Sequence, residues 1–170
     1  MNRYVALLRA VNVGGTGKLP MADLRALCES AGFSRVSTYI ASGNVLFESA
    51  MSSLDARARL ARALQDYAGK PVGVQLRQPA DLARLRDGNP WPGAAGNRVI
   101  VVFLEAPLPE GWESRVKGRG EEQLQAQADA LYIHYGEGMR ESKLVVPDAS
   151  VGTARNLNTV ARLAELSALP

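Results

Sequence analysis

Three short segments contain most of the residues in this chain that could bind a ligand. They are RAVNVGGTGK (9–18), ASGN (41–44) and GTARNLNT (152–159), and each stands where a run of apolar residues stops. Gly, Asn, Ser and Thr dominate them, together with Arg and Lys, rather than the usual acid–base residues. Exposed backbone amides, side-chain amides and fixed positive charge are the groups that hold anions. The sequence therefore predicts a polar site for an anionic ligand.

The first segment resembles two nucleotide-binding loops and matches neither. A P-loop needs G-x-x-x-x-G-K-[ST], but the residue five before Gly17 is Asn12 and Leu19 follows Lys18. A dinucleotide-binding loop would need its third glycine where this chain has Pro20. Exposed amides and a lysine near a helix start can still hold an anion. The alternative is a loop whose glycines serve only the backbone conformation.

The third segment is predicted to begin the last helix of the chain. Thr153 is a suitable N-cap, and Arg155 would then lie beside the free amides of the first turn. Asn156 and Asn158 are unfavourable inside a helix, which indicates either a ligand contact or a docking role. The alternative is that Arg155 pairs with an acidic residue of the first half.

Other chemistry finds little support. The single histidine, His134, and the single cysteine, Cys28, cannot form a zinc site, and Cys28 falls in a helical apolar pattern. Ser42 lacks a nucleophile motif and a base, so its predicted role is in a turn. We expect no metal and no cofactor. An enzyme that stabilises an oxyanion without an identifiable nucleophile stays open as a third interpretation.

The composition favours a soluble protein of the cytoplasm. Of the 170 residues, 46% are hydrophobic and 22% charged, and the net charge of +3 permits an anionic ligand. The arginines are spread along predicted helices instead of forming a stripe, and VLFES (45–49) lacks the aromatic pattern of RNA-recognition motifs. Nucleic-acid binding is therefore disfavoured. No apolar run approaches 18 residues and no signal peptide is recognisable, so we expect no membrane contact.

Hydrophobic periodicity predicts six elements in the first half of the chain. They are strand 3–9, helix 21–31, strands 35–41 and 45–48 with a turn at 42–44, helix 53–68 and strand 72–77. The order β-α-β-β-α-β is that of ferredoxin-like proteins.

The same periodicity assigns faces to these elements. The apolar stripe of helix 53–68 is predicted to be Leu54, Ala58, Ala61, Leu64 and Tyr67. Alternation places a half-polar set of strand residues on the sheet face away from the helices. This face is solvated, covered by the rest of the chain, or a binding surface. The set is Ser37, Tyr39, Ala41, Leu46, Glu48, Gln75 and Arg77.

The second half is predicted to be a smaller α+β region that ends in a helix. Its elements are helix 81–87, strand 98–104, a helical turn at 112–118, strands 122–127 and 131–135, a short helix 139–144 and helix 154–169. We predict a ferredoxin-like subdomain over residues 1–80 and a second subdomain over residues 81–170.

Two stretches resemble a known family. Residues 4–49 (YVALLRAVNVGGTGKLPMADLRALCESAGFSRVSTYIASGNVLFES) closely resemble the start of the bacterial family known as domain of unknown function 1697. SKL (142–144) and TARNLNTVARLAEL (153–166) resemble its C-terminal signature. The resemblance implies a two-layer α+β fold with a ferredoxin-like first part, and no established activity. This chain has Leu157 where the family usually has Trp, and a shorter stretch between Leu144 and Thr153.

These observations together predict a cytoplasmic binding protein for a nucleotide or phosphorylated metabolite. The competing hypothesis is that the polar residues lock the two halves together and the protein acts through a partner or as a homodimer. The predicted ligand-binding residues are Arg9, Asn12, Gly14, Gly15, Lys18, Ser42, Asn44, Lys143, Thr153, Arg155, Asn156 and Asn158.

Overall fold

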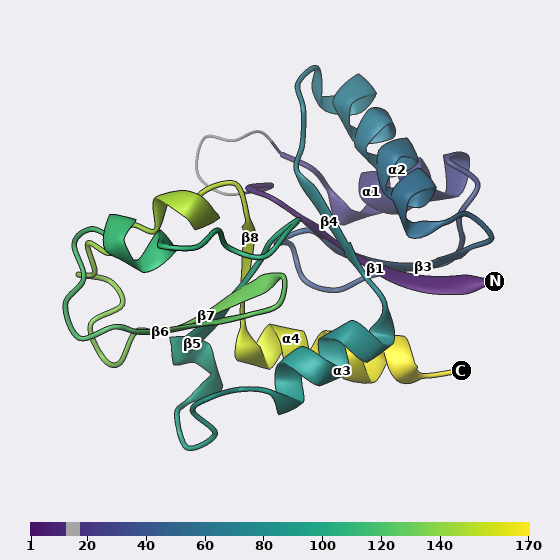
Figure 1. Cartoon of the computed structure of the whole chain (residues 1–170). Coiled ribbons are helices and arrows are strands. Elements are labelled where there is room, and N and C mark those ends of the chain that lie inside the picture. The colour runs from purple at the N-terminus through teal and green to yellow at the C-terminus, as the bar shows by residue number, and fades with distance from the viewer. Residues whose placement is uncertain (13–17) are drawn as a thin grey trace. The chain divides into compact units, whose positions relative to one another are not determined.

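The structure, a computed structural model, describes residues 1–12 and 18–170 (Figure 1). The described chain forms two compact units. Met1–Ala83 and Leu163–Pro170 make up the first unit, and Arg84–Arg162 make up the second. The polypeptide thus leaves the first unit after Ala83 and returns to it at Leu163. The division between residues 80 and 81, which gives each half one continuous segment, stays a prediction.

The first unit has the ferredoxin-like architecture predicted from the sequence. Its sheet has the order β2-β3-β1-β4, with every neighbouring pair antiparallel. Figure 1 shows both helices, α1 and α2, on one face of this sheet. The elements are β1 (Asn2–Leu8), α1 (Met21–Ser30), β2 (Ser34–Thr38), β3 (Asn44–Ser49), α2 (Ser53–Ala68) and β4 (Val74–Arg77).

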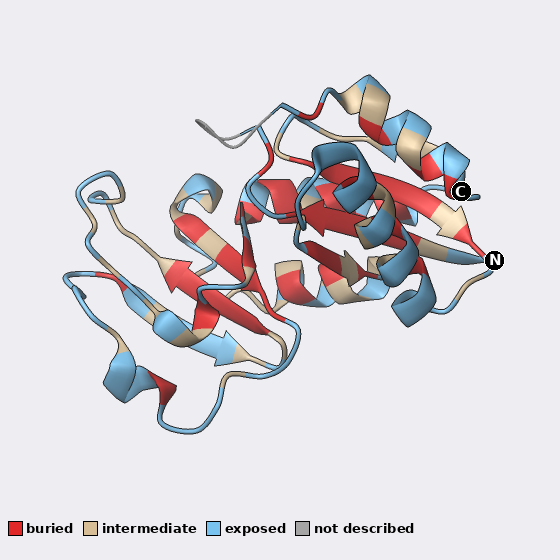
Figure 2. Ribbon diagram, turned by 90° about the horizontal axis from the view of Figure 1, so that it is seen from above, coloured by how far each residue is buried: buried red, intermediate tan, exposed pale blue. Residues whose placement is uncertain are grey.

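Strand alternation builds the core between the sheet and the two helices. Tyr4, Ala6 and Leu8 of β1 point to the helices because successive strand residues face opposite sides. The rings of Phe33 and Phe47 stack with centroids 4.1 Å apart. Figure 2 shows the buried residues concentrated along the strands. The core therefore fixes the ends of β1, β3 and β4.

The bounds of α2 agree with the sequence, but the predicted stripe is wrong. Ser52 caps the helix by accepting a hydrogen bond from the Asp55 amide at 3.1 Å. The buried residues are Ala56, Leu60 and Leu64, whereas Leu54 is 72% exposed. Alanines on several sides of α2 give little contrast in hydrophobicity, so two stripes that share Leu64 fit the sequence nearly equally well.

The β2–β3 turn also differs in detail from the hairpin expected at residues 42–44. Gly43 has φ of +89° as expected, but the second positive φ belongs to Ile40. Asn44 is the fully buried first residue of β3. Its side-chain amide donates to the Tyr39 carbonyl at 2.9 Å and to the Ser42 hydroxyl at 3.1 Å. These bonds close the turn from inside the strand.

The half-polar face of the first sheet is covered in part. Leu46, Gln75 and Arg77 on it are buried, whereas Ser37 and Ala41 are exposed. Leu46 lines a small hollow together with Leu166 of the C-terminal segment. The guanidinium group of Arg3 donates to the Ser167 carbonyl at 3.0 Å. The C-terminal segment thus covers the part of this face around Leu46, and the part around Ser37 and Ala41 stays exposed.

The second unit is built on a four-stranded antiparallel sheet of order β6-β7-β5-β8. Leu131 and Ile133 of β7 pack with Val102 of β5 and with Trp112 in its core. Its strands are β5 (Val99–Phe103), β6 (Gln123–Gln127), β7 (Ala130–His134) and β8 (Thr153–Asn156). Helices α3 (Pro79–Asp87) and α4 (Leu157–Ala168) belong partly to each unit.

In the second half, the predicted helix 139–144 is absent, and the predicted last helix is present but begins at Leu157 instead of residue 154. Residues 139–144 form a turn and an extended stretch that ends in a bridge between Lys117 and Val145. Residues 153–156 form strand β8, in which Thr153 lies opposite Phe103 and Arg155 opposite Val101. Thr153 is therefore not the N-cap of the last helix. The strand was missed because it is only four residues long and continues directly into α4.

Candidate functional site

The topology of the first unit brings three connections to one edge of its sheet. In the register, Leu7 lies opposite Asn44 and Leu8 opposite Val74. The end of β1 therefore lies beside the beginnings of β3 and β4. The β1–α1 connection, the β2–β3 turn and the α2–β4 connection must meet at this edge.

Close backbone contacts join the three connections. The Leu8 amide donates to the Gly43 carbonyl at 2.8 Å, and the Arg9 amide donates to the Gly73 carbonyl at 2.9 Å. A Cβ on Gly43 would lie 2.5 Å from Cγ2 of Val11. Position 43 therefore needs glycine both for its positive φ and for this approach.

Asn12 ties the β1–α1 connection together through its side chain. Its amide nitrogen donates to the Leu19 carbonyl at 2.9 Å and to the Ala41 carbonyl at 2.8 Å. Its amide oxygen accepts from the Leu19 amide at 2.7 Å. These bonds hold the two described ends of the connection together and place Lys18 beside Leu19.

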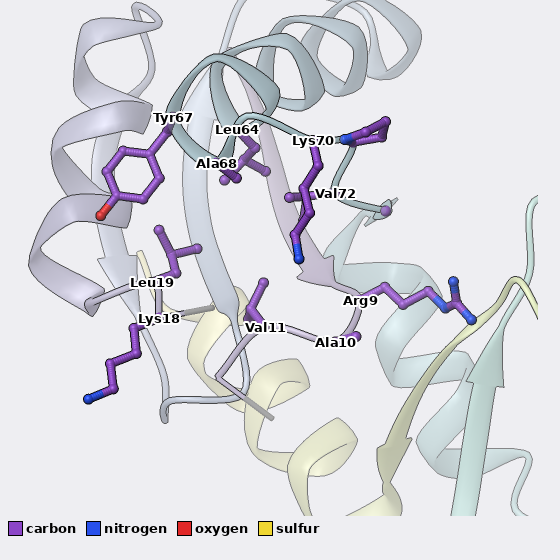
Figure 3. Close-up of a pocket in the computed structure, with 12 residues that line it drawn as sticks. Arg9, Ala10, Val11, Lys18, Leu19, Leu64, Tyr67, Ala68, Lys70 and Val72 are labelled. Carbon is purple, nitrogen blue, oxygen red and sulfur yellow. The ribbon is translucent and has the colours of Figure 1, made fainter. Parts of the chain in front are cut away.

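A cavity of about 630 Å³ lies between the β1–α1 and α2–β4 connections. Val11, Leu19, Leu64 and Val72 supply apolar walls. Figure 3 shows the Lys70 side chain extending toward Val11, while those of Arg9 and Lys18 extend outward on opposite sides. The complete set of described lining residues is Arg9, Ala10, Val11, Lys18, Leu19, Leu64, Tyr67, Ala68, Lys70, Pro71, Val72 and Gly73.

The cavity is positively charged. Three of its described lining residues are cations and none is acidic. The acid associated with the cavity wall is Asp23 of α1, whose carboxylate accepts a hydrogen bond from the Tyr67 hydroxyl at 2.6 Å. This bond raises the pKa of Tyr67 above its ordinary value, because the proton is held between the two oxygens. Tyr67 is therefore a neutral hydrogen-bond donor at neutral pH.

Of the predicted site residues, Arg9 and Lys18 line this cavity. Asn12, Ser42 and Asn44 lie in the connections beside it and make the backbone and turn hydrogen bonds described above. Gly14 and Gly15 lie outside the described residues. Lys143, Thr153, Arg155, Asn156 and Asn158 belong to the second unit, so convergence of all three predicted segments stays a prediction.

Residues 153–158 are engaged in the local fold of the second unit. Thr153 is 2% exposed, and Arg155 is buried and donates to its neighbour's carbonyl, that of Ala154, at 2.9 Å. Burial lowers the pKa of Arg155 to about 10, because the charged form loses hydration. Asn156 accepts from the Thr159 amide at 2.9 Å, which makes it the N-cap of α4. Arg155 therefore stands in a strand, not in the first turn of a helix.

Asn158 and the segment around Lys143 also make close local contacts. A Cβ on Gly96 would lie 2.1 Å from the Asn158 side-chain oxygen. Lys143 is exposed, but its carbonyl oxygen would lie 2.0 Å from a Cβ on Gly118. The neighbouring Ser142 hydroxyl donates to Glu122 at 2.5 Å and lowers the pKa of that carboxyl. Both Asn158 and the backbone of Lys143 are thus packed closely against a glycine of the second unit.

Sequence reasoning missed Lys70 and Tyr67 as site residues. The sequence pattern ends the second helix at residue 68 and gives GKP (69–71) no role beyond a connection, and it places Tyr67 in an apolar stripe. In fact Gly69 ends α2 with φ of +73°, and Lys70 follows it into the cavity wall. A signal was present, because in an antiparallel βαββαβ sheet the start of β4 must lie beside the end of β1.

Among the described residues, neither a metal site nor a reactive cysteine is present. Within residues 1–12 and 18–170, no group of three or more His, Cys, Asp or Glu could hold a metal ion. Burial raises the pKa of the Cys28 thiol to about 12, so this thiol is not a nucleophile at neutral pH. No helix in the described part of the chain is long and apolar enough to span a membrane.

The fold and the cavity define a two-unit α+β protein with a ferredoxin-like first unit and a cationic hollow at one sheet edge. The chain belongs to the family described as protein of unknown function (DUF1697), whose model matches residues 1–132. The matched residues include the cavity, whereas residues 142–159 lie beyond them. A comparison with curated proteins found no match.

The chain is also similar in structure to a conserved bacterial protein, SP0830, from Streptococcus pneumoniae. The two share 23% sequence identity over 98% of each chain, with a TM-score of 0.77. This similarity establishes the α+β fold over nearly the whole chain.

Proposed function

We propose that this protein binds a small anionic ligand in the cavity between the β1–α1 and α2–β4 connections. The observation that carries the proposal is the cavity's composition: Arg9, Lys18 and Lys70 on apolar walls, with no acidic residue among the described lining residues. A volume of about 630 Å³ is in the range of small-molecule sites, roughly 300–1,000 Å³. A phosphate group attached to a small organic body fits this description.

The proposed roles follow from charge and position. Lys70 extends over the cavity and would contact the anion directly (Figure 3). Lys18 would contribute long-range attraction from the opposite connection. Lysine ammonium groups bind phosphate as point charges, and the attraction strengthens where apolar walls exclude water. Arg9 is the third cation, and its backbone also anchors the start of β4 through Gly73.

We also propose that the protein works in the cytoplasm of a bacterium. Its single cysteine, Cys28, is buried and free, which suits a reducing compartment. The similar structure comes from a bacterium.

The proposal is tested by calorimetric titration of the full chain with inorganic phosphate and ribose 5-phosphate. We expect Lys70→Ala to weaken ribose 5-phosphate binding about tenfold or more, since a hydrogen bond to a charged group contributes roughly 1.5–3 kcal/mol. Lys18→Ala should weaken ribose 5-phosphate binding less than Lys70→Ala does. Added salt should weaken binding to the wild-type protein, because it screens the attraction between charges. Lys117→Ala is the matched control, because it removes an exposed lysine of the second unit. If all three variants bound ribose 5-phosphate as tightly as the wild-type protein, the proposal would be contradicted.

For residues 153–158 a second function is favoured by a specific observation. Thr153 and Arg155 are buried in β8, and Asn156 caps α4. We therefore propose that this segment serves the local structure of the second unit, while the competing hypothesis of a lock between the two halves stays a prediction.

A further inference from the structure

Tyr67 is the one aromatic residue among the described residues that line the cavity. It lies in the last turn of α2, and 45% of it is exposed, although the sequence pattern predicted it to be part of the buried stripe. The ring therefore offers an accessible flat surface beside the three cations of the cavity.

The ring is held in place from both ends. Its hydroxyl group donates to Asp23 of α1 at 2.6 Å, while its backbone belongs to α2. Figure 3 shows the ring beside Leu19 and close to Leu64. A side chain fixed in this way loses little rotamer freedom when a ligand contacts it. Tyr67 is therefore a preorganised aromatic surface.

We propose that the ligand is a nucleoside monophosphate, whose base stacks on the ring of Tyr67 and whose phosphate lies beside Lys70. This inference rests on the proposed function and names the class of ligand for the same cavity. Leu19 and Leu64 are already buried in the core, so the largest exposed apolar group of the cavity is the ring of Tyr67, which phosphate alone or a bare sugar phosphate would leave without an apolar partner. A nucleobase has two flat faces, and every type of base can stack on an aromatic ring.

The alternative is that Tyr67 only joins the two helices. It also lines a second hollow on the outer side of α1 and α2, together with Leu27 and Ala63. A purely structural tyrosine would contribute to stability through the bond to Asp23 and would have no effect on which ligand is bound. The two roles are separated by ligand chemistry, not by stability.

The experiment compares adenosine 5′-monophosphate, ribose 5-phosphate and adenosine on the full chain by calorimetry. We expect the wild-type protein to bind adenosine 5′-monophosphate about tenfold or more tightly than ribose 5-phosphate, the difference given by one base–aromatic stack. Tyr67→Leu should abolish this difference, measured as the ratio of the two affinities in the same variant. Tyr67→Phe keeps the ring, removes the bond to Asp23 and should retain the difference. Lys70→Ala should weaken the binding of both adenosine 5′-monophosphate and ribose 5-phosphate.

The outcomes separate this inference from the proposed function. If the wild-type protein binds the two phosphates equally well, stacking on Tyr67 is refuted and the anion site stands. If it binds neither these two phosphates nor inorganic phosphate, both proposals fail. Retention of the difference in Tyr67→Leu assigns Tyr67 to helix joining and overturns the inference. Loss of the difference in Tyr67→Phe, which keeps the ring, overturns it as well, because stacking on the ring then does not set the difference. Should Tyr67→Leu not fold, the wild-type ratio together with Tyr67→Phe decides the question.

Discussion

Asn12 and Asn44, two predicted ligand-binding residues, hold the backbone of the connections in place through their side-chain amides. Both stand where polar groups collect at the end of a strand, and this position led to their assignment to a site. In the structure their amides bond to the Leu19, Ala41 and Tyr39 carbonyls. The sequence could identify the positions as unusual, but it could not identify the partners, since these lie up to 29 residues away.

Gly43 is the residue on which the meeting of the connections depends most directly. We expect Gly43→Ala to lower the free energy of unfolding by about 2–5 kcal/mol, from the left-handed backbone and the contact with Val11 together. Gly69→Ala is the matched control, with φ of +73° and nothing within 4 Å of the added Cβ. It should cost only about 1–2 kcal/mol. Urea unfolding of both variants measures the difference, and equal losses would refute the proposed close packing.

At the scale of elements, periodicity was a sufficient guide wherever apolar and polar residues contrast strongly. It predicted the order of strands and helices in the first unit, including the start and end of α2. It failed at β8, because four residues are too few for a period and because Thr153 suits both a strand and a helix cap. It also failed at residues 139–144, where pairing between Lys117 and Val145 determines the backbone.

The beginning of α4 can be tested by its capping residue. Asn156→Ala should destabilise the protein by about 0.5–2 kcal/mol, because the Thr159 amide loses its acceptor. Asn156→Asp keeps an acceptor at the same place and should retain most of the stability. Thermal unfolding of the two variants distinguishes this cap from the one predicted at Thr153. If Asn156→Ala is as stable as the wild type, Asn156 is not the functional cap.

At the scale of the whole molecule, no pattern in the sequence indicates that the chain returns to its first unit. Leu163 and Ala164 are buried and belong to the first unit, yet periodicity within α4 says only that one side of the helix is covered. Which sheet covers it depends on contacts between distant parts of the chain. The cavity was missed for the same reason, since Lys70 and Lys18 come from different connections.

Leu163 provides the test of this return. We expect Leu163→Ala to lower the free energy of unfolding by about 2–5 kcal/mol, because the side chain is fully buried and its removal leaves a cavity. Leu169→Ala removes the same atoms from a residue that is 58% exposed and should have a much smaller effect. Chemical denaturation followed by circular dichroism measures both. Similar losses in the two variants would contradict the assignment of Leu163 to a core.

The return of residues 163–170 also has a consequence for biosynthesis. Domains generally fold as units in the order in which the ribosome makes them, the N-terminal one first. Here the segment that completes the first unit is translated last, after the whole of Arg84–Arg162 has emerged. The second unit, a continuous stretch, can close before the first is complete. A nascent chain that stalls before Leu163 would therefore carry a sheet whose second face is still uncovered.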